Sequence, residues 1–234
     1  MKSQYDIHVN TPATGLVWAG QCVIDEDDGR PRRVAFRYLT QYVQSPSAFA
    51  LDPEHLPLHA GETVFDCADG LPGFLDDYLP DAWGRKVLAR WAFHRHQRAL
   101  PPQSAIAMLD LMDHRRIGAL CFTPPRIAPR YEGGLPIEHL AKAELAGRHI
   151  DNDGYAQATL DEASLLYLAS SGSGVGGARP KALISDGDTE YLAKFNRAAG
   201  SPSGDAYNNA RVEDRKSTRL NSSHVSESRM PSSA

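Results

Sequence analysis

A run of glycines in the second half of the chain imposes the strongest constraint on the fold. Gly172, Gly174, Gly176 and Gly177 occupy four of six consecutive positions. Because glycine loses the most backbone freedom in a helix or strand and reaches conformations closed to other residues, such a run belongs in a loop. The backbone N–H groups of such a loop can turn toward one point and hold phosphate oxygens, and a flexible linker is the alternative.

The residues that follow the glycines favour the phosphate-binding interpretation. The stretches ALIS and EYLAKFN flank an Asp/Gly turn, a pattern that predicts a β-hairpin. A helix is predicted before the run and a strand after it, the reverse of a dinucleotide-binding loop, and the Gly-Lys-Ser/Thr of a Walker loop is missing. A glycine loop followed by a strand, a turn and a strand-borne lysine, here Lys194, is the arrangement of the nucleotide-clamping lobe of protein kinases. Glu213 would then orient Lys194, and a purely structural ion pair between the two is the alternative.

Length and composition set broad limits. The 234 residues carry a net charge of −4 and 41% hydrophobic residues, which fits one large or two small domains. The acidic balance gives no reason to expect direct contact with nucleic acid. The N-terminus lacks the apolar segment of a signal peptide, no stretch is long enough to span a membrane, and the three cysteines are scattered. We therefore expect a cytoplasmic protein that does not contact a membrane.

The first third of the chain has the composition of a β-sheet. The stretches YDIHV, TGLVWAGQCVID and RRVAFRYLTQYV are rich in β-branched and aromatic residues, and DEDDGRP predicts a hairpin turn between the last two. Residues 46–65 contain several prolines and a glycine, so we expect an irregular segment there. Near residue 104 the stretch SAIAMLDLM predicts a short helix, and RIGALCFTP predicts a strand that closes the first domain.

Residues 73–98 have a helical pattern that Pro80 divides, and Asp81 is the expected N-cap of the second part. Apolar residues at helical spacing predict one buried stripe, formed by Trp83, Val87, Leu88 and Trp91. Basic residues dominate the rest of this helix and predict a solvated face: Arg85, Lys86, Arg90, Arg95 and Arg98.

The last 21 residues, 214–234, differ from the rest of the chain. Seven of them are serine and they show no hydrophobic period, which predicts disorder. The string also resembles the translation of a sequencing adapter, so we expect the natural polypeptide to stop at about Glu213 and exclude the tail from fold reasoning.

Several motifs together resemble the HipA family, the protein-serine kinases of bacterial toxin–antitoxin modules. The motifs are GVGGARPKALI, YLAKFN and DAYNNARVE, and FLDDYLPDAWGRKVL resembles the N-terminal signature of the family. The resemblance implies an α+β architecture: a HipA-like N-terminal domain (1–125), a connecting helical segment (126–170) and a partial kinase-like N-lobe (171–213). It also implies ATP-binding residues, namely Gly176, Gly177, Ala178, Arg179, Pro180, Lys181 and Lys194, with Glu213 as the partner of Lys194.

One position departs from the family pattern. Well-studied members carry an autophosphorylated serine two residues before the paired glycines, where this chain has Gly174. Ser173 is therefore the candidate for autophosphorylation, and an ordinary loop serine is the alternative.

The resemblance also implies what lies outside this chain. In the family the catalytic Asp and the ligands of Mg²⁺ belong to a C-lobe that follows the helix with Glu213, so no catalytic or metal-binding residue is expected here. We expect a fragment, inactive by itself, of a Ser/Thr kinase that uses ATP and Mg²⁺, phosphorylates a serine of a protein substrate and is neutralised by a HipB-like antitoxin. DNA contact is expected only through that antitoxin. A non-catalytic module that docks the antitoxin is the alternative.

Overall fold

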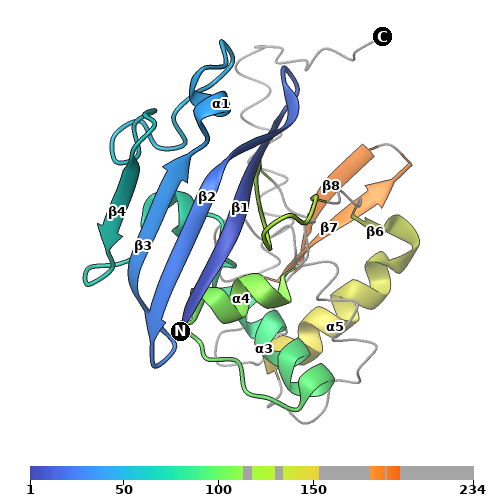
Figure 1. The fold of residues 1–234 in the computed structure, drawn as a ribbon. Helices are drawn as coiled ribbons and strands as arrows, with labels where there is room; N and C mark the ends of the chain where they lie inside the picture. The colour runs from blue at the N-terminus through green and yellow to red at the C-terminus, as the bar shows by residue number, and fades with distance from the viewer. Residues whose placement is uncertain (113–117, 130–133, 153–179, 188, 196–234) are drawn as a thin grey trace, which may run out of the picture.

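An antiparallel sheet forms the N-terminal part of the molecule. The computed structural model describes residues 1–112, 118–129, 134–152, 180–187 and 189–195. Three long strands follow one another as a meander: β1 (Lys2–Thr11), β2 (Gly15–Asp27) and β3 (Arg30–Tyr38). The short strands β4 (Glu62–Asp66) and β5 (Leu120–Thr123) complete its two edges, giving the order β4-β3-β2-β1-β5 (Figure 1).

The predicted hairpin turn between β2 and β3 is confirmed. Asp28 and Gly29 adopt positive φ angles of 49° and 69°, as a tight hairpin turn requires. Two predictions near β3 need correction. The strand ends at Tyr38, and Thr40–Val43 form the short helix α1 instead of continuing it. Residues 62–66, expected to be irregular, form β4, because this stretch pairs with β3 from Arg33 to Arg37.

One face of this sheet is buried by short helices. Helix α2 (Gly73–Asp76) and helix α4 (Ala105–Leu111) contribute apolar side chains to the same cluster as the strands. Aromatic rings connect the layers, since the Phe36 ring lies 5.4 Å from Phe74 in an edge-on contact. The cluster includes the following residues from strands and helices: Ile7, Val9, Cys22, Ile24, Val34, Phe36, Phe74, Leu75, Ile106 and Met108.

A buried carboxylate fastens the β2–β3 hairpin to α4. Glu26 is 3% exposed, and its two oxygens accept hydrogen bonds from Ser104 Oγ (2.7 Å) and the Ile106 backbone N–H (2.9 Å). Ser104 in turn caps α4, because its Oγ accepts a hydrogen bond from the Ala107 N–H at 2.9 Å. The carboxylate thus satisfies two donors at the start of the helix, which explains how an acidic residue is tolerated inside the core.

Helix α3 (Ala82–His96) packs on two neighbours at once. Leu88 joins the core of the sheet domain, whereas Trp83 and Val87 form a second cluster with Ala146 and Ile150 of helix α5 (Leu140–Asn152). The Asp81 cap is confirmed, because its side chain accepts a hydrogen bond from Gly84 N–H at 2.8 Å.

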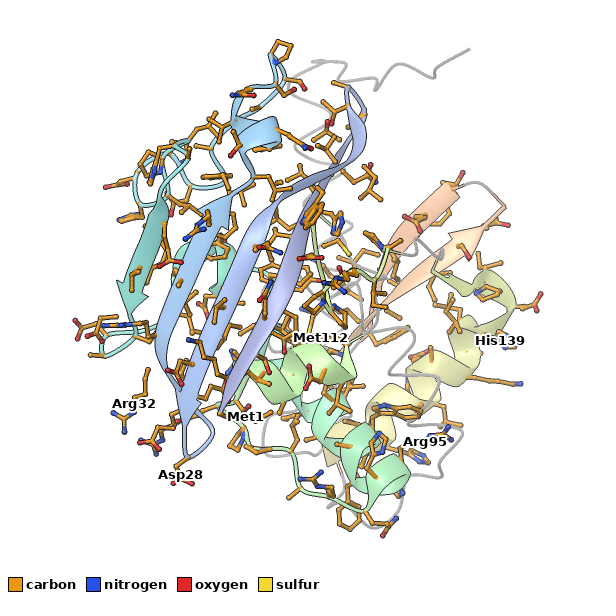
Figure 2. All side chains as sticks on the ribbon, in the orientation of Figure 1. Met1, Asp28, Arg32, Arg95, Met112 and His139 are labelled. Atoms are coloured by element: carbon orange, nitrogen blue, oxygen red, sulfur yellow. The ribbon has the colours of Figure 1, made fainter. Side chains whose placement is uncertain are left out.

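The predicted surface of α3 is partly wrong. Arg90, expected in solvent, is only 4% exposed, because it continues the helical spacing of Trp83 and Val87 on a helix that packs on two sides. Trp91, expected in the buried stripe, is only partly buried. The exposed Arg95, near the end of α3 (Figure 2), lies 5.8 Å above the Trp91 ring.

A small second sheet lies beside α5 (Figure 1). The predicted hairpin is confirmed as β7 (Lys181–Asp186) and β8 (Thr189–Lys194). The segment expected to connect the domains contributes β6 (Leu135–Pro136), which pairs with β7 in parallel and leads through the 3₁₀ turn η1 (Ile137–His139) into α5. Four apolar side chains at this sheet form a buried cluster with Ala143 of α5: Leu135, Ala182, Ile184 and Phe195.

Two glycines allow a matched test of this packing. A Cβ on Gly20 would lie 2.6 Å from the Arg37 carbonyl oxygen, whereas a Cβ on Gly147 would lie 3.5 Å from the Pro180 Cβ. We predict that Gly20→Ala lowers the free energy of unfolding by about 1–3 kcal/mol. Gly147→Ala, inside a helix, should raise it by about 0.5–1 kcal/mol. Urea unfolding measures both, and equal stability of the two variants would contradict the close approach of β2 and β3.

Candidate functional site

The β7–β8 hairpin brings together the two lysines that the sequence assigns to nucleotide binding. Lys181 and Lys194 are directly opposite each other in the antiparallel register. The Phe195 backbone N–H donates a hydrogen bond of 2.8 Å to the Pro180 carbonyl and closes the open end of the hairpin. Lys181 begins β7 and Lys194 ends β8, so both lysines lie at this end of the hairpin.

Pro180, Lys181 and Lys194 are the predicted site residues that the structure describes. The others lie outside the described residues: Ser173, Gly176, Gly177, Ala178, Arg179 and Glu213. The expected pairing of Lys194 with Glu213 therefore stays a prediction.

Lys181 is buried, with 3% of the residue exposed. Its Nζ donates a hydrogen bond to Oδ2 of Asp81, in an ion pair between residues 100 positions apart. The side chains of the lysine and the aspartate are 4% and 12% exposed. Because Oδ1 of Asp81 accepts from Gly84 N–H, one carboxylate both caps α3 and binds the lysine.

Lys194 differs from Lys181 in its surroundings, because its side chain is exposed. Like charges directly opposite each other on neighbouring strands destabilise a sheet. The Asp81 carboxylate offsets the charge of Lys181 and so reduces this repulsion. At this end the hairpin therefore carries an exposed lysine, Lys194, opposite a buried lysine, Lys181, that is paired with Asp81.

Tight packing fixes the position of the hairpin on the N-terminal part. Gly147 of α5 faces Pro180, Phe195 and Trp83, whose nearest atoms lie 3.5, 3.7 and 4.0 Å from the position that a Cβ would take. Trp83 is fully buried at this junction, and its Nε1 has no hydrogen-bond partner among the described residues. The signature segment from Leu79 to Arg85 thus contributes both an ion pair and an aromatic side chain to the junction.

A separate cavity of about 570 Å³ opens near the tip of the β2–β3 hairpin, where Asp28 and Arg32 lie (Figure 2). Its charged lining combines both signs: Arg30, Arg32, Arg85, Asp66, Asp69 and Asp76. Cys67 also lines it, and burial raises the pKa of this thiol above its usual range. A thiol that stays protonated is a poor nucleophile, so this cavity lacks the features of a covalent catalytic site.

Two other classes of site were sought in the described part of the chain. No group of three or more His, Cys, Asp or Glu side chains within it is arranged to hold a metal ion. Within the same residues, no helix is both long enough and apolar enough to cross a membrane.

Comparison with known proteins identifies the N-terminal part. Residues 18–123 match the family model described as the HipA N-terminal domain. The matched range begins within β2 and ends with β5. The match includes the segment Leu79–Arg85, so the similarity to this family extends over the strands and helices from β2 to β5. A search of curated proteins found no match. The matched range ends before β6, so the β7–β8 hairpin lies beyond it.

Sequence reasoning found Asp81 as a helix cap and Lys181 as part of the nucleotide loop, but not the bond between them. No local pattern signals this bond, because each residue has a sufficient local explanation. The available signals were an Asp in the N-terminal signature and a lysine, Lys181, directly after the glycine-rich segment.

Trp83 allows a test of the junction. We predict that Trp83→Ala lowers the free energy of unfolding by about 3–5 kcal/mol, because it leaves a large cavity. Trp83→Phe should cost less than about 1.5 kcal/mol, since it retains much of the volume and removes a buried N–H. Urea unfolding followed by far-UV circular dichroism compares the two. Equal losses would mean that the indole N–H makes a hydrogen bond outside the described residues.

Proposed function

We propose that this chain carries the N-terminal domain and part of the nucleotide-binding lobe of an ATP-dependent protein Ser/Thr kinase of the HipA type. The observation that carries the proposal is the β7–β8 hairpin, which follows the glycine-rich segment and ends on Lys194 with its side chain exposed. A glycine loop that covers the phosphates and a strand lysine that pairs with them form the corresponding part of kinases. The match of residues 18–123 to the HipA N-terminal domain supports the same assignment.

In this proposal the glycine-rich segment and Lys194 hold the phosphates of ATP, and Glu213 orients the lysine. Mg²⁺ would bridge the phosphate oxygens when the nucleotide is bound. The substrate is a serine of a cellular protein, and a HipB-like antitoxin neutralises the kinase and mediates contact with DNA.

Phosphoryl transfer also needs a carboxylate that accepts the proton of the substrate hydroxyl. The acidic residues of the described hairpin have structural roles instead. Glu190 accepts a hydrogen bond of 3.2 Å from the Gly134 N–H, and Asp186 flanks the turn. We therefore propose that the 234-residue chain is inactive by itself and that the catalytic Asp is encoded beyond Glu213.

A second candidate function is a protein-interaction module that docks the antitoxin without catalysis. Large apolar side chains exposed on the N-terminal sheet favour it: Leu16 and Trp18 of β2 are each 43% exposed, and Val64 of β4 is 48% exposed. The two candidates differ in the gene. Resequencing is expected to extend the reading frame past Glu213 into a segment with a catalytic-loop Asp and a later metal-binding Asp. A native stop codon directly after Glu213 would exclude the kinase and support the docking module.

ATP binding is tested on the protein expressed from the uninterrupted gene. We predict that MgATP at about 100 times its Kd stabilises this protein by about 2.7 kcal/mol, seen as a rise in Tm. Lys194→Ala should lose most of this stabilisation, because it removes a cation from the phosphates.

Lys142→Ala, which removes an exposed lysine from α5, is the matched control and should retain the full stabilisation. Equal stabilisation of wild type and Lys194→Ala would contradict the role of Lys194. No stabilisation of the wild type would contradict nucleotide binding itself.

A further inference from the structure

We propose that Asp81 is a positioning residue for nucleotide binding, acting through Lys181 as the anchor of the glycine-rich segment. This inference rests on the proposed function, because it concerns the loop that would hold ATP. It gives Lys181 a different task from the direct phosphate contact that the family resemblance implies. In this view Lys181 holds the end of the loop in place, and Lys194 provides the strand cation for the phosphates.

The first argument is the burial of the pair. The Lys181 side chain is 4% exposed and its ammonium group already donates to the Asp81 carboxylate. A direct phosphate contact would require this ammonium to leave a largely desolvated carboxylate, 12% exposed, without its cation, which is unfavourable. Lys194, opposite Lys181 on the hairpin, has an exposed side chain instead.

The second argument is that the Asp81 carboxylate is oriented before the lysine contacts it. Its Oδ1 accepts a hydrogen bond from Gly84 N–H at 2.8 Å, and the carboxylate caps the N-terminal end of the 15-residue helix α3. A helix N-terminus favours a negative charge, so the cap is held there by both the hydrogen bond and the helix dipole. Oδ2 remains directed at Lys181, which makes Asp81 a rigid acceptor rather than a flexible surface acid.

The third argument is the place of Lys181 in the chain. It is the first residue of β7, directly after the last residues of the glycine-rich segment. Pro180 before it contacts Gly147 of α5, and its carbonyl accepts the Phe195 N–H. A shift of Lys181 would therefore move both the exit of the glycine-rich segment and the end of β8 that carries Lys194. Through this pair, a change at the start of α3 reaches the nucleotide site without touching the nucleotide.

A double-mutant cycle tests the proposal on the 234-residue chain and on the longer protein of the ATP experiment. The variants are Asp81→Asn, Lys181→Met and the double variant. Asn preserves the cap of α3, because its side-chain oxygen can accept from Gly84 N–H, and Met matches the length of Lys without its charge. Asp77→Asn and Lys142→Met make the same changes at exposed positions and serve as controls.

Thermal unfolding of the 234-residue chain gives the first result. Each single variant should lower Tm by about 6–12 °C, because it leaves an uncompensated buried charge. The double variant should recover most of this loss, and the controls should not change Tm. If the Tm losses of the two single variants simply add in the double variant, the proposed anchoring role of the pair is wrong.

Titration with MgATP gives the second result. If loss of the anchor leaves about one tenth of the molecules competent to bind, each single variant raises Kd about 10-fold. The double variant should bind no more weakly than either single one. If Asp81→Asn leaves Kd unchanged while Lys181→Met raises it, Lys181 is a phosphate ligand and the inference is wrong, although the proposed function stands. If the wild type binds no MgATP, the proposed function fails and the positioning role of Asp81 fails with it, whatever the Tm values show.

Discussion

The buried ion pair between Asp81 and Lys181 joins the two parts of the molecule. Asp81 caps α3, which packs on the sheet domain through Leu88, and Lys181 begins the strand from which the second sheet extends. Two charged groups withdrawn from water are tolerated only when each satisfies the other with good geometry. Their contact therefore fixes not just the distance but also the orientation of the hairpin relative to α3. Pro180, which precedes Lys181, and Trp83, which lies in the first turn of α3, are both close to Gly147 of α5.

Local patterns predicted much of the fold because the forces behind them are local. Alternating β-branched residues, the Asp28–Gly29 turn, the break at Pro80 and the cap at Asp81 each depend on a few neighbouring residues. Strand β4 was missed because prolines and a glycine precede it in the sequence, which predicts an irregular segment. Its five residues gain their stability from pairing with β3. Arg90 was placed in solvent because nothing in the sequence of α3 indicates that α5 covers its second side.

The candidate site was predictable in part for the same reason. The order of glycines, hairpin and lysine is a local pattern, and the hairpin is present with Lys194 at its end. Lys181 pairs with an acid 100 positions earlier in the chain. This contact depends on how the two parts of the molecule pack together, and no short stretch of sequence indicates that packing. This pair directs the Lys181 ammonium group to Asp81, whereas the Lys194 side chain is exposed. The match of residues 18–123 gives the family context for the N-terminal partner in that contact.

The two-sided packing of α3 has a consequence for the order in which the protein acquires its structure during synthesis. The sheet domain is complete once β5 has emerged from the ribosome, and Leu88 can be buried at that point. Trp83 and Val87 must wait for Ala146 and Ile150, and Asp81 waits longer still for Lys181. During this interval the nascent chain displays an aromatic and aliphatic stripe beside an uncompensated carboxylate, a surface that molecular chaperones and aggregation compete for. Helix α5 then covers the apolar stripe, and the last contact to form, that of Lys181, compensates the carboxylate.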